Sequence, residues 1–389
     1  MNDKPITFVP DALDSGVHQA ARTPRKDAVL LLAHGTPDVL GEMAEYLGKV
    51  TGGRALPQEI VEELQHRYGE IGLAETPGVE PPPLTKWTLR QGHLLQRTLG
   101  LAGPKVYVGM RNWHPYIADV VQQMRTDGVT HVKAVCLAPQ NSRTSVGLYR
   151  KAVLDVSAGL NVEFVAGWAE HPLLAQAFAE NLWPVWAEAC ASTSSELGKT
   201  TRIPVLFTAH SVPCRTIMTG EASIAGARPG TPMQATPDAY PVEAKSTAQL
   251  VADRLAIVGF RESDWFFAFQ SQGVAGGPWI GPTVEDTLKA IKAAGHAGVV
   301  MQPIGFLCDH VEILYDIDIA FRETATELGL KLWRAESLND SPVLVKALSQ
   351  VVTGQYKATI DEQPTRQSPH SYVQDERKND GFTQIGQLD

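Results

Sequence analysis

The chain has 389 residues, of which 43% are hydrophobic and 20% charged, a composition typical of a soluble globular protein with room for two domains. Its formal net charge of −9 argues against nucleic acid as the main partner, because binding to phosphates needs a basic face. We expect a cytoplasmic protein without a membrane span, since no run approaches the roughly 18 uninterrupted apolar residues of a spanning helix and the polar residues 1–26 lack the apolar core of a secretory signal.

From residue 27 onward, short strand-like runs alternate with longer amphipathic segments. Residues 75–83 are rich in proline and are expected to form a loop at the edge of a cleft. We expect a flexible N-terminus over residues 1–26 and an N-terminal α/β domain over 27–160. In this half the predicted strands are 28–33, 105–108, 132–137 and 162–165, and the predicted helices are 58–68, 86–99 and 116–127.

The second half repeats the alternation and is expected to form a C-terminal α/β domain over 161–356, with its last helix packing back on the first domain. Residues 221–240, rich in Gly, Ala and Pro, are expected to be a lid or a mobile insertion. Residues 357–389 are polar with almost no aliphatic side chains, which predicts a disordered tail. The predicted strands are 205–208, 265–269 and 299–303, and the predicted helices are 173–191, 242–258 and 283–294.

The alternation predicts an α/β fold of two similar Rossmann-like domains, each a parallel β-sheet flanked by helices. Each series opens with a strand that ends in Ala-His, at His34 in the first copy and His210 in the second. Because the carboxyl ends of parallel strands face the ligand crevice, both histidines are expected at an active-site cleft between the domains. Such a cleft would suit a flat ligand with a metal at its centre. Taken alone, His210 could equally be a satisfied core histidine.

A dense set of polar residues follows the predicted strand 299–303. Asp309 is well placed to cap the next helix, on which Glu312 and Asp316 are four residues apart and share a face. Two carboxylates on one face repel each other, which indicates cation binding or proton handling unless the face is simply solvated. His310 points about 100° away from its neighbours on a helix, so we expect it to support the site rather than bind the same ion as Glu312.

Several other chemistries are disfavoured by the motifs. The four cysteines are scattered without a CxxC pair, which supports neither a disulfide framework nor an iron–sulfur or zinc cluster. A P-loop, a G-x-G-x-x-G fingerprint, an H-E-x-x-H zinc motif and a G-x-S-x-G elbow are all missing from the sequence. We therefore do not expect nucleotide chemistry, a zinc protease or an acyl-transfer hydrolase.

Several blocks of the chain, in order between about residues 27 and 350, resemble the ferrochelatases. The block 303–316 is the most specific, and the segment 137–149 is most similar to the soluble, monomeric coproporphyrin III ferrochelatases of Gram-positive type. The blocks that carry the resemblance are 209–213, 270–271 with 278–282, and 303–316, together with 35–37, 67–68, 71–72, and 137–139 with Ser142 and Tyr149.

The resemblance implies an enzyme of haem biosynthesis that inserts ferrous iron into a porphyrin, with Fe²⁺ as substrate and without an iron–sulfur cluster. It implies that His210 and Glu312 are the catalytic pair and bind the metal, with Asp316 behind them. Many relatives carry tyrosine in place of His34, and imidazole is the stronger ligand for ferrous iron, so His34 is expected to be the axial ligand of the product iron. The residues implied to bind the porphyrin are His34, Arg54, Arg67, Tyr68, Tyr149, Ser271 and Trp279.

Two further departures from the family pattern are visible. Ala320 stands where the row of carboxylates beyond Asp316 usually continues, so a path that feeds metal along this row would be shorter. The Gly-Asp-Pro-Tyr expected after the second Ala-His block is replaced by residues 237–240, behind the long insertion.

We expect the cleft to bend the porphyrin so that its nitrogen lone pairs are exposed, with His210 as general base and Glu312 as an oxygen ligand. The expected product is coprohaem, made from coproporphyrin III by a monomeric enzyme. One alternative is a protoporphyrin IX ferrochelatase or another tetrapyrrole chelatase. A second alternative is a carrier that binds haem or porphyrin without catalysis.

Overall fold

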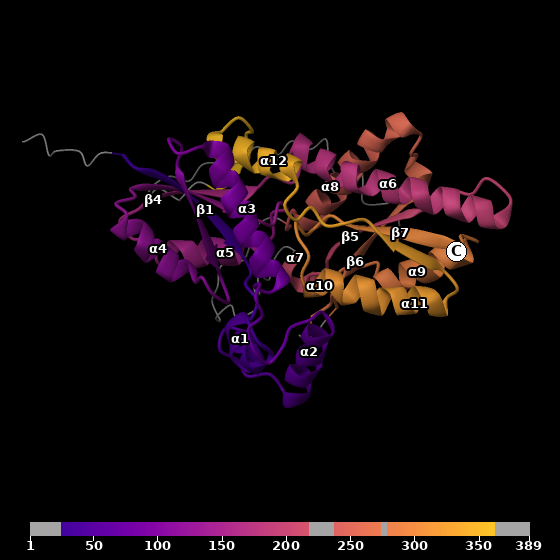
Figure 1. Ribbon diagram of the computed structural model, residues 1–389, viewed down its shortest axis with the longest axis horizontal. Helices are drawn as coiled ribbons and strands as arrows, with labels where there is room; N and C mark the ends of the chain where they lie inside the picture. Colours follow the sequence, from indigo (N-terminus) through magenta and orange to yellow (C-terminus); the bar gives the residue numbers. More distant parts are fainter. Residues whose placement is uncertain (1–24, 218–236, 274–277, 362–389) are drawn as a thin grey trace, which may run out of the picture.

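The computed structural model describes residues 25–217, 237–273 and 278–361, and it contains two β-sheets set side by side (Figure 1). The expectations for residues 1–24, for most of the 221–240 insertion and for 362–389 lie outside the described residues. Within the described part, no helix is long and apolar enough to cross a membrane.

The first sheet has the strand order β2-β1-β3-β4-β9. Its first four strands run parallel, and β9 pairs antiparallel with β4 at the edge. The central strand β1 is buried on both faces, as expected for a parallel sheet covered by helices. The strands are β1 (Asp27–Ala33), β2 (Lys105–Met110), β3 (His131–Cys136), β4 (Asn161–Gly167) and β9 (Thr359–Asp361).

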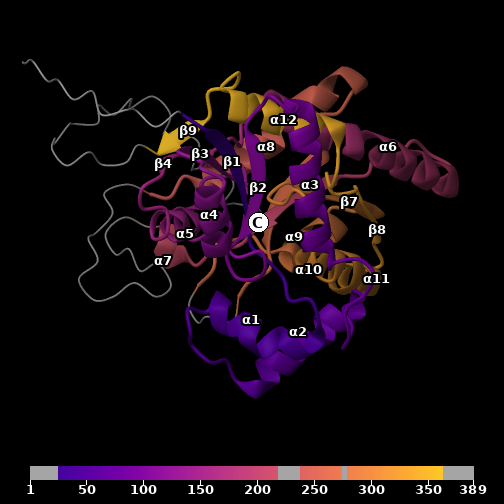
Figure 2. The same ribbon diagram turned by 60° about the vertical axis from the view of Figure 1, so that its left-hand side comes forward.

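Alternate residues of β1 face different helices because side chains alternate across a strand. Leu30 and Leu32 pack against α4 and α5, whereas Val29 and Leu31 share a core with α3 and α6. A small unit made of α1 and α2 projects away from both sheets (Figures 1 and 2). The elements of this half are η1 (Leu40–Glu42), α1 (Met43–Val50), α2 (Gln58–Glu70), α3 (Pro83–Leu99), α4 (Ile117–Thr126) and α5 (Val146–Leu154).

The second sheet is wholly parallel, with the order β6-β5-β7-β8. One of its faces packs on α9, α11 and the π-helix η4, and the other on α6, α8 and α12. Its strands are β5 (Val205–His210), β6 (Trp265–Gln270), β7 (Gly298–Pro303) and β8 (Lys331–Arg334). Its helices are α6 (Pro172–Leu197), α7 (Cys214–Ile217), α8 (Tyr240–Leu255), η2 (Ala256–Val258), η3 (Glu262–Asp264), α9 (Val284–Ala293), α10 (Val311–Leu314), η4 (Asp316–Phe321), α11 (Arg322–Glu327) and α12 (Pro342–Thr353).

The protein is an α/β protein with two parallel-dominated sheets flanked by helices. The predicted domain boundary between residues 160 and 161 is wrong, because β4 pairs with β3 inside the first sheet. The sequence shows the order of strands along the chain but not which sheet each strand joins. The expected disorder from residue 357 is also wrong for β9, which is too short to give a periodic signal. Helix α12, the last helix of the second domain, packs against α6 of its own domain and against α3 of the first domain.

Candidate active site

A cavity of about 540 Å³ lies at the carboxyl ends of β1 and β5, between the two sheets. Its volume falls in the ordinary range for a small-molecule site. Both domains line it, and six of the residues expected to bind metal or porphyrin are on its wall: His34, Tyr68, Tyr149, His210, Trp279 and Glu312. The two strand-end histidines therefore do face one cavity.

His34 enters the cavity directly after β1, and Gly35 turns the chain behind it. Gly35 has φ +89°, and a Cβ there would lie 2.7 Å from the backbone nitrogen of Trp113, so this turn needs glycine. Removal from water, helped by the positive charge of Arg111, lowers the pKa of His34 to about 3. The ring is therefore neutral at pH 7, and Asn112 Nδ2 lies 2.9 Å from its Nε2.

His210 and Glu312 form an ion pair on the wall of the same cavity, with His210 Nε2 3.5 Å from Glu312 Oε1. The Nδ1–H of His210 donates to the Ser211 carbonyl, which leaves Nε2 directed at the carboxylate. Burial alone would lower the pKa of His210, but the charge and hydrogen bond of Glu312 raise it to about 9. Burial would likewise raise the pKa of Glu312, and the charge of His210 instead holds it well below its usual range. The pair is therefore an imidazolium beside a carboxylate.

The second oxygen of Glu312 is not used by this pair. Glu312 Oε2 is buried and accepts no hydrogen bond from any residue that the structure describes. His310 Nε2 approaches it to 3.9 Å, while His310 Nδ1 is bound to the Cys308 carbonyl at 2.9 Å. Gln270 Nε2 donates to the main-chain oxygen of Glu312 at 2.8 Å and steadies the helix start. Glu312 is thus anchored through its main chain and paired through Oε1, while its buried Oε2 lies nearest to His310.

Asp316 lies behind the cavity wall rather than on it. It is the first residue of η4, Ser271 Oγ donates to its Oδ2, and Arg67 Nη1 lies 3.8 Å from its Oδ1. Burial, followed by the charge of Glu312, raises the pKa of Asp316. Arg67 and Ser271, which the resemblance implied as porphyrin contacts, therefore touch Asp316. Arg54 is exposed after α1 and also lies away from the cavity wall.

Asp309 does not cap α10 as expected. His310 occupies the N-cap position of α10, and no side chain forms a capping hydrogen bond there. Asp309 instead accepts hydrogen bonds from Ser337 Oγ at 2.7 Å and Asn339 Nδ2 at 3.0 Å, with Arg334 Nη1 3.4 Å away. The carboxylate of Asp309 therefore faces the loop before α12, where the hydroxyl, amide and guanidinium donors of these three residues lie.

Several residues on the wall escaped the sequence analysis, among them Tyr46, Arg111, Gln91 and Gln140. Arg111 directly follows β2, which runs two residues further than the predicted strand, and its guanidinium lies 5.5 Å from the Tyr149 ring. Checking the residue after every strand, as for His34 and His210, would have found it. Tyr46 lies on α1, a short helix with too few turns to stand out by periodicity.

The predicted metal ligands do not form one preassembled site. Among the described residues, no three His, Cys, Asp or Glu side chains lie close enough together to hold a metal ion. The structure brings His210 and Glu312 together, places Asp316 behind them, and puts His34 on the same cavity wall without joining it to this pair. A metal that entered here would meet one pair first and the remaining groups separately.

Comparisons with known proteins show what the chain is similar to. Residues 26–356 match the family model described as Ferrochelatase. A "Ferrochelatase" of Acidobacterium capsulatum is 54% identical over 326 residues, covering 83% of this chain and 93% of the relative. The "Ferrochelatase" of Herpetosiphon aurantiacus is 38% identical, covering 85% and 99%. The "Coproporphyrin III ferrochelatase" of Geobacillus kaustophilus is 30% identical, covering 83% and 94%.

Proposed function

We propose that this chain, which belongs to the ferrochelatase family, inserts Fe²⁺ into coproporphyrin III to give coprohaem. The observation that carries the proposal is the pairing of His210 with the Glu312 carboxylate on the cavity wall, with His210 Nε2 3.5 Å from Glu312 Oε1. A carrier of finished haem has no need for a paired base and carboxylate beside the ring. Relatives named coproporphyrin III ferrochelatases, about 30% identical over most of the chain, support the choice of substrate.

The reaction replaces two pyrrole protons by one Fe²⁺ ion. Before iron arrives, His210 already carries a proton and cannot accept another. When Fe²⁺ meets the Glu312 carboxylate, it neutralises the charge that holds this proton and adds a positive charge nearby, so His210 releases the proton to water. The neutral ring is then a general base that accepts one pyrrole proton, passes it to water, and accepts the second. Metal entry and readiness of the base are coupled in this way.

His34 is proposed as the axial ligand of the product iron from the opposite wall. Its ring is neutral at pH 7, so a nitrogen lone pair is available without loss of a proton. Tyr68, Tyr149 and Trp279 would contact the flat faces and edges of the ring, and Arg111 is a cation on the cavity wall for one of its carboxylates. We propose Asp316 as a relay for incoming iron and Arg54 and Arg67 as outer partners of the propionates. The protein is proposed to be a cytoplasmic monomer.

The test is anaerobic mixing of the purified protein with Fe²⁺ and, separately, coproporphyrin III or protoporphyrin IX, followed by absorption. The free-base bands should collapse to a metalloporphyrin pattern, and faster with coproporphyrin III. Faster reaction with protoporphyrin IX would overturn the substrate assignment. A sirohydrochlorin-type ring as the preferred substrate would indicate another chelatase. A red-shifted Soret band without insertion would leave a carrier and would remove the catalytic roles of His210 and Glu312.

A further inference from the structure

The segment that joins β7 to α10, residues 304–310, decides where Glu312 stands, and we call it the connector. It crosses the end of β5 closely, since a Cβ on Gly305 would lie 3.1 Å from Ala209 Cα, next to His210. The connector belongs to the second domain, but two of its anchors come from the first. Both anchors are glutamine amides, those of Gln91 and Gln140.

Gln140, which follows β3, holds the start of the connector. Its Nε2 donates to the Ile304 carbonyl at 3.0 Å and lies 3.1 Å from Thr247 Oγ1 on α8. The side chain is 2% exposed, and Ile304 is fully buried. Water therefore has little access to replace this bond, and its loss would leave a buried carbonyl without a donor.

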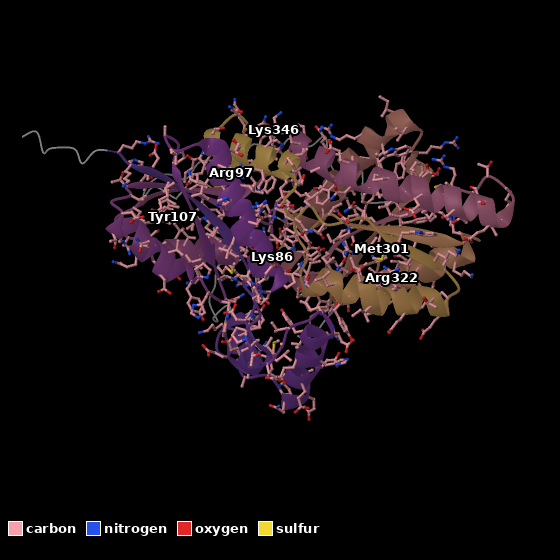
Figure 3. All side chains as sticks on the ribbon, in the orientation of Figure 1. Lys86, Arg97, Tyr107, Met301, Arg322 and Lys346 are labelled. Carbon is pink, nitrogen blue, oxygen red and sulfur yellow. The ribbon has the colours of Figure 1, made fainter. Side chains whose placement is uncertain are left out.

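Gln91 holds the far end of the connector through Asn339. Its Nε2 donates to the Asn339 carbonyl at 2.7 Å, and Gln91 is fully buried on α3. Helices α3 and α12 pack together between the domains (Figure 3, in which Lys86 and Arg97 lie on α3 and Lys346 on α12). Asn339 lies in the loop just before α12, so this bond also crosses from one domain to the other.

Asn339 in turn forms hydrogen bonds with Leu307 and Asp309 of the connector, which precede Glu312 in the chain. Its main-chain nitrogen donates to the Leu307 carbonyl at 2.9 Å. Its Oδ1 accepts from the Asp309 main-chain nitrogen at 2.9 Å, and its Nδ2 donates to Asp309 Oδ2 at 3.0 Å. The φ of Asn339 is +44°, a left-handed conformation that asparagine tolerates better than most residues.

We propose that Gln91 and Gln140 are positioning residues, which fix the connector to the first domain and so hold Glu312 in register with His210 and with a porphyrin seated on the opposite wall. The inference rests on the proposed function for its catalytic consequence. The physical reason is that His34 and His210 come from different domains, so the cavity keeps its geometry only if the domains keep theirs. A misplacement of about 1 Å at a reacting group can cost on the order of a hundredfold in rate.

The test uses Gln91→Met and Gln140→Met in the full chain, since methionine keeps the length and volume of glutamine but cannot donate to a carbonyl. The matched control is Gln96→Met, on the same helix α3. Gln96 accepts from the Val106 nitrogen at 2.8 Å and donates to the Gly100 carbonyl at 3.2 Å, so its bonds stay inside the first domain.

For Gln91→Met and Gln140→Met we expect kcat to fall at least about tenfold, with the porphyrin Kd within about twofold of wild type. Gln96→Met should retain the kcat of wild type even if its unfolding temperature falls by as much as in the two test variants. An unchanged kcat, an equal loss of kcat in Gln96→Met, or a loss confined to porphyrin binding would each overturn the proposal. The last result would make the two glutamines substrate contacts.

A second measurement does not depend on activity. Amide hydrogen exchange in peptides that cover residues 304–312 should be faster in Gln91→Met and Gln140→Met than in wild type, and unchanged in Gln96→Met. If either variant fails to fold, Asn339→Gly keeps the positive φ and the main-chain bonds while removing the amide link to Asp309, and it should show the same faster exchange. Unchanged exchange would overturn the proposal. An inactive wild type with the expected exchange pattern would instead count against the proposed function.

Discussion

His34 and His210 follow β1 and β5, line the same cavity, and differ in charge at pH 7. The pKa of His34 is lowered to about 3 by removal from water and by Arg111, whereas that of His210 is raised to about 9 by Glu312 despite burial. One ring can therefore offer a lone pair while the other holds a proton. The two strand ends are equivalent in the fold, but their neighbouring residues give the two histidines different protonation states. This difference suits a ligand that needs a metal ligand and a proton-handling group.

His210→Ala should abolish iron insertion, with kcat lowered by at least about a hundredfold, because a general base contributes that much or more. The porphyrin Kd should change by less than about threefold, since most of the cavity wall remains. Stopped-flow absorption gives the rate, and fluorescence quenching of free-base porphyrin gives the Kd. His93→Ala, an exposed histidine on α3, is the control and should behave as wild type. Retained turnover with lost binding would contradict the role.

His34→Ala should shift the visible spectrum of the iron–porphyrin complex, because the iron loses a strong axial nitrogen ligand. Turnover should fall less than in His210→Ala, by about tenfold or under, as His34 acts mainly on the product side. His34→Tyr should give a third spectrum, with a phenol oxygen in place of the imidazole. An unchanged spectrum in both variants would remove His34 from the coordination of the iron.

The alternation of strands and helices and the place of His210 at a strand end could be predicted from local patterns, whereas the pairing of His210 with Glu312 was implied by the resemblance to the ferrochelatases. An apolar run with Ala-His at its end places a side chain at a sheet edge, and a spacing of four residues places Glu312 and Asp316 on one side of a helix. The π-helix η4 changes that geometry, since its wider turn starts at Asp316, and Asp316 lies behind the wall instead of beside Glu312 on it.

What escaped prediction depends on contacts between distant segments. The carboxylate of Asp309 follows donors on Ser337, Asn339 and Arg334 rather than its own helix. The edge of the first sheet also depends on such a contact, because β9 returns from the far end of the chain to pair with β4. The pKa of His34 is lowered by burial and then by Arg111, and that of His210 is raised by Glu312, so both depend on residues that are far away in the chain.

Asp316→Asn should raise the apparent KM for Fe²⁺ about fivefold or more, with a smaller effect on kcat at saturating iron, if Asp316 relays incoming metal. Asparagine can still accept from Ser271, so the unfolding temperature should change little. Asp318→Asn is the matched control, because Asp318 is held by Arg334 at 2.7 and 2.8 Å and serves the fold. That variant should lower the unfolding temperature and leave the iron KM unchanged. The same outcome for Asp316→Asn would give Asp316 a structural role only.

Gly35→Ala should destabilise the protein by about 1–3 kcal/mol and impair insertion, because strain at positive φ is joined by a clash with Trp113. Gly53→Ala is a control for the backbone term alone, since its φ is +91° but no heavy atom lies within 4 Å of the added Cβ. Urea unfolding of both variants separates strain from clash. Equal losses of stability would show that the contact with Trp113 adds nothing.

Stability should fall as the pH is lowered from about 6.5 to 4, in part because of His171 at the start of α6. Its Nδ1 accepts from the Leu173 nitrogen at 3.0 Å, its ring packs on Tyr356, and burial lowers its pKa to about 4. Between these pH values the unfolded chain binds a proton at this histidine that the folded chain does not, so the free energy of unfolding decreases as pH falls. His171→Asn keeps a helix-capping side chain and removes the titration. Urea unfolding at pH 7.5 and pH 4.5 should show a loss of stability smaller in the variant by on the order of 1–2 kcal/mol, and an equal loss in both proteins would mean that His171 charges as readily in the fold as outside it.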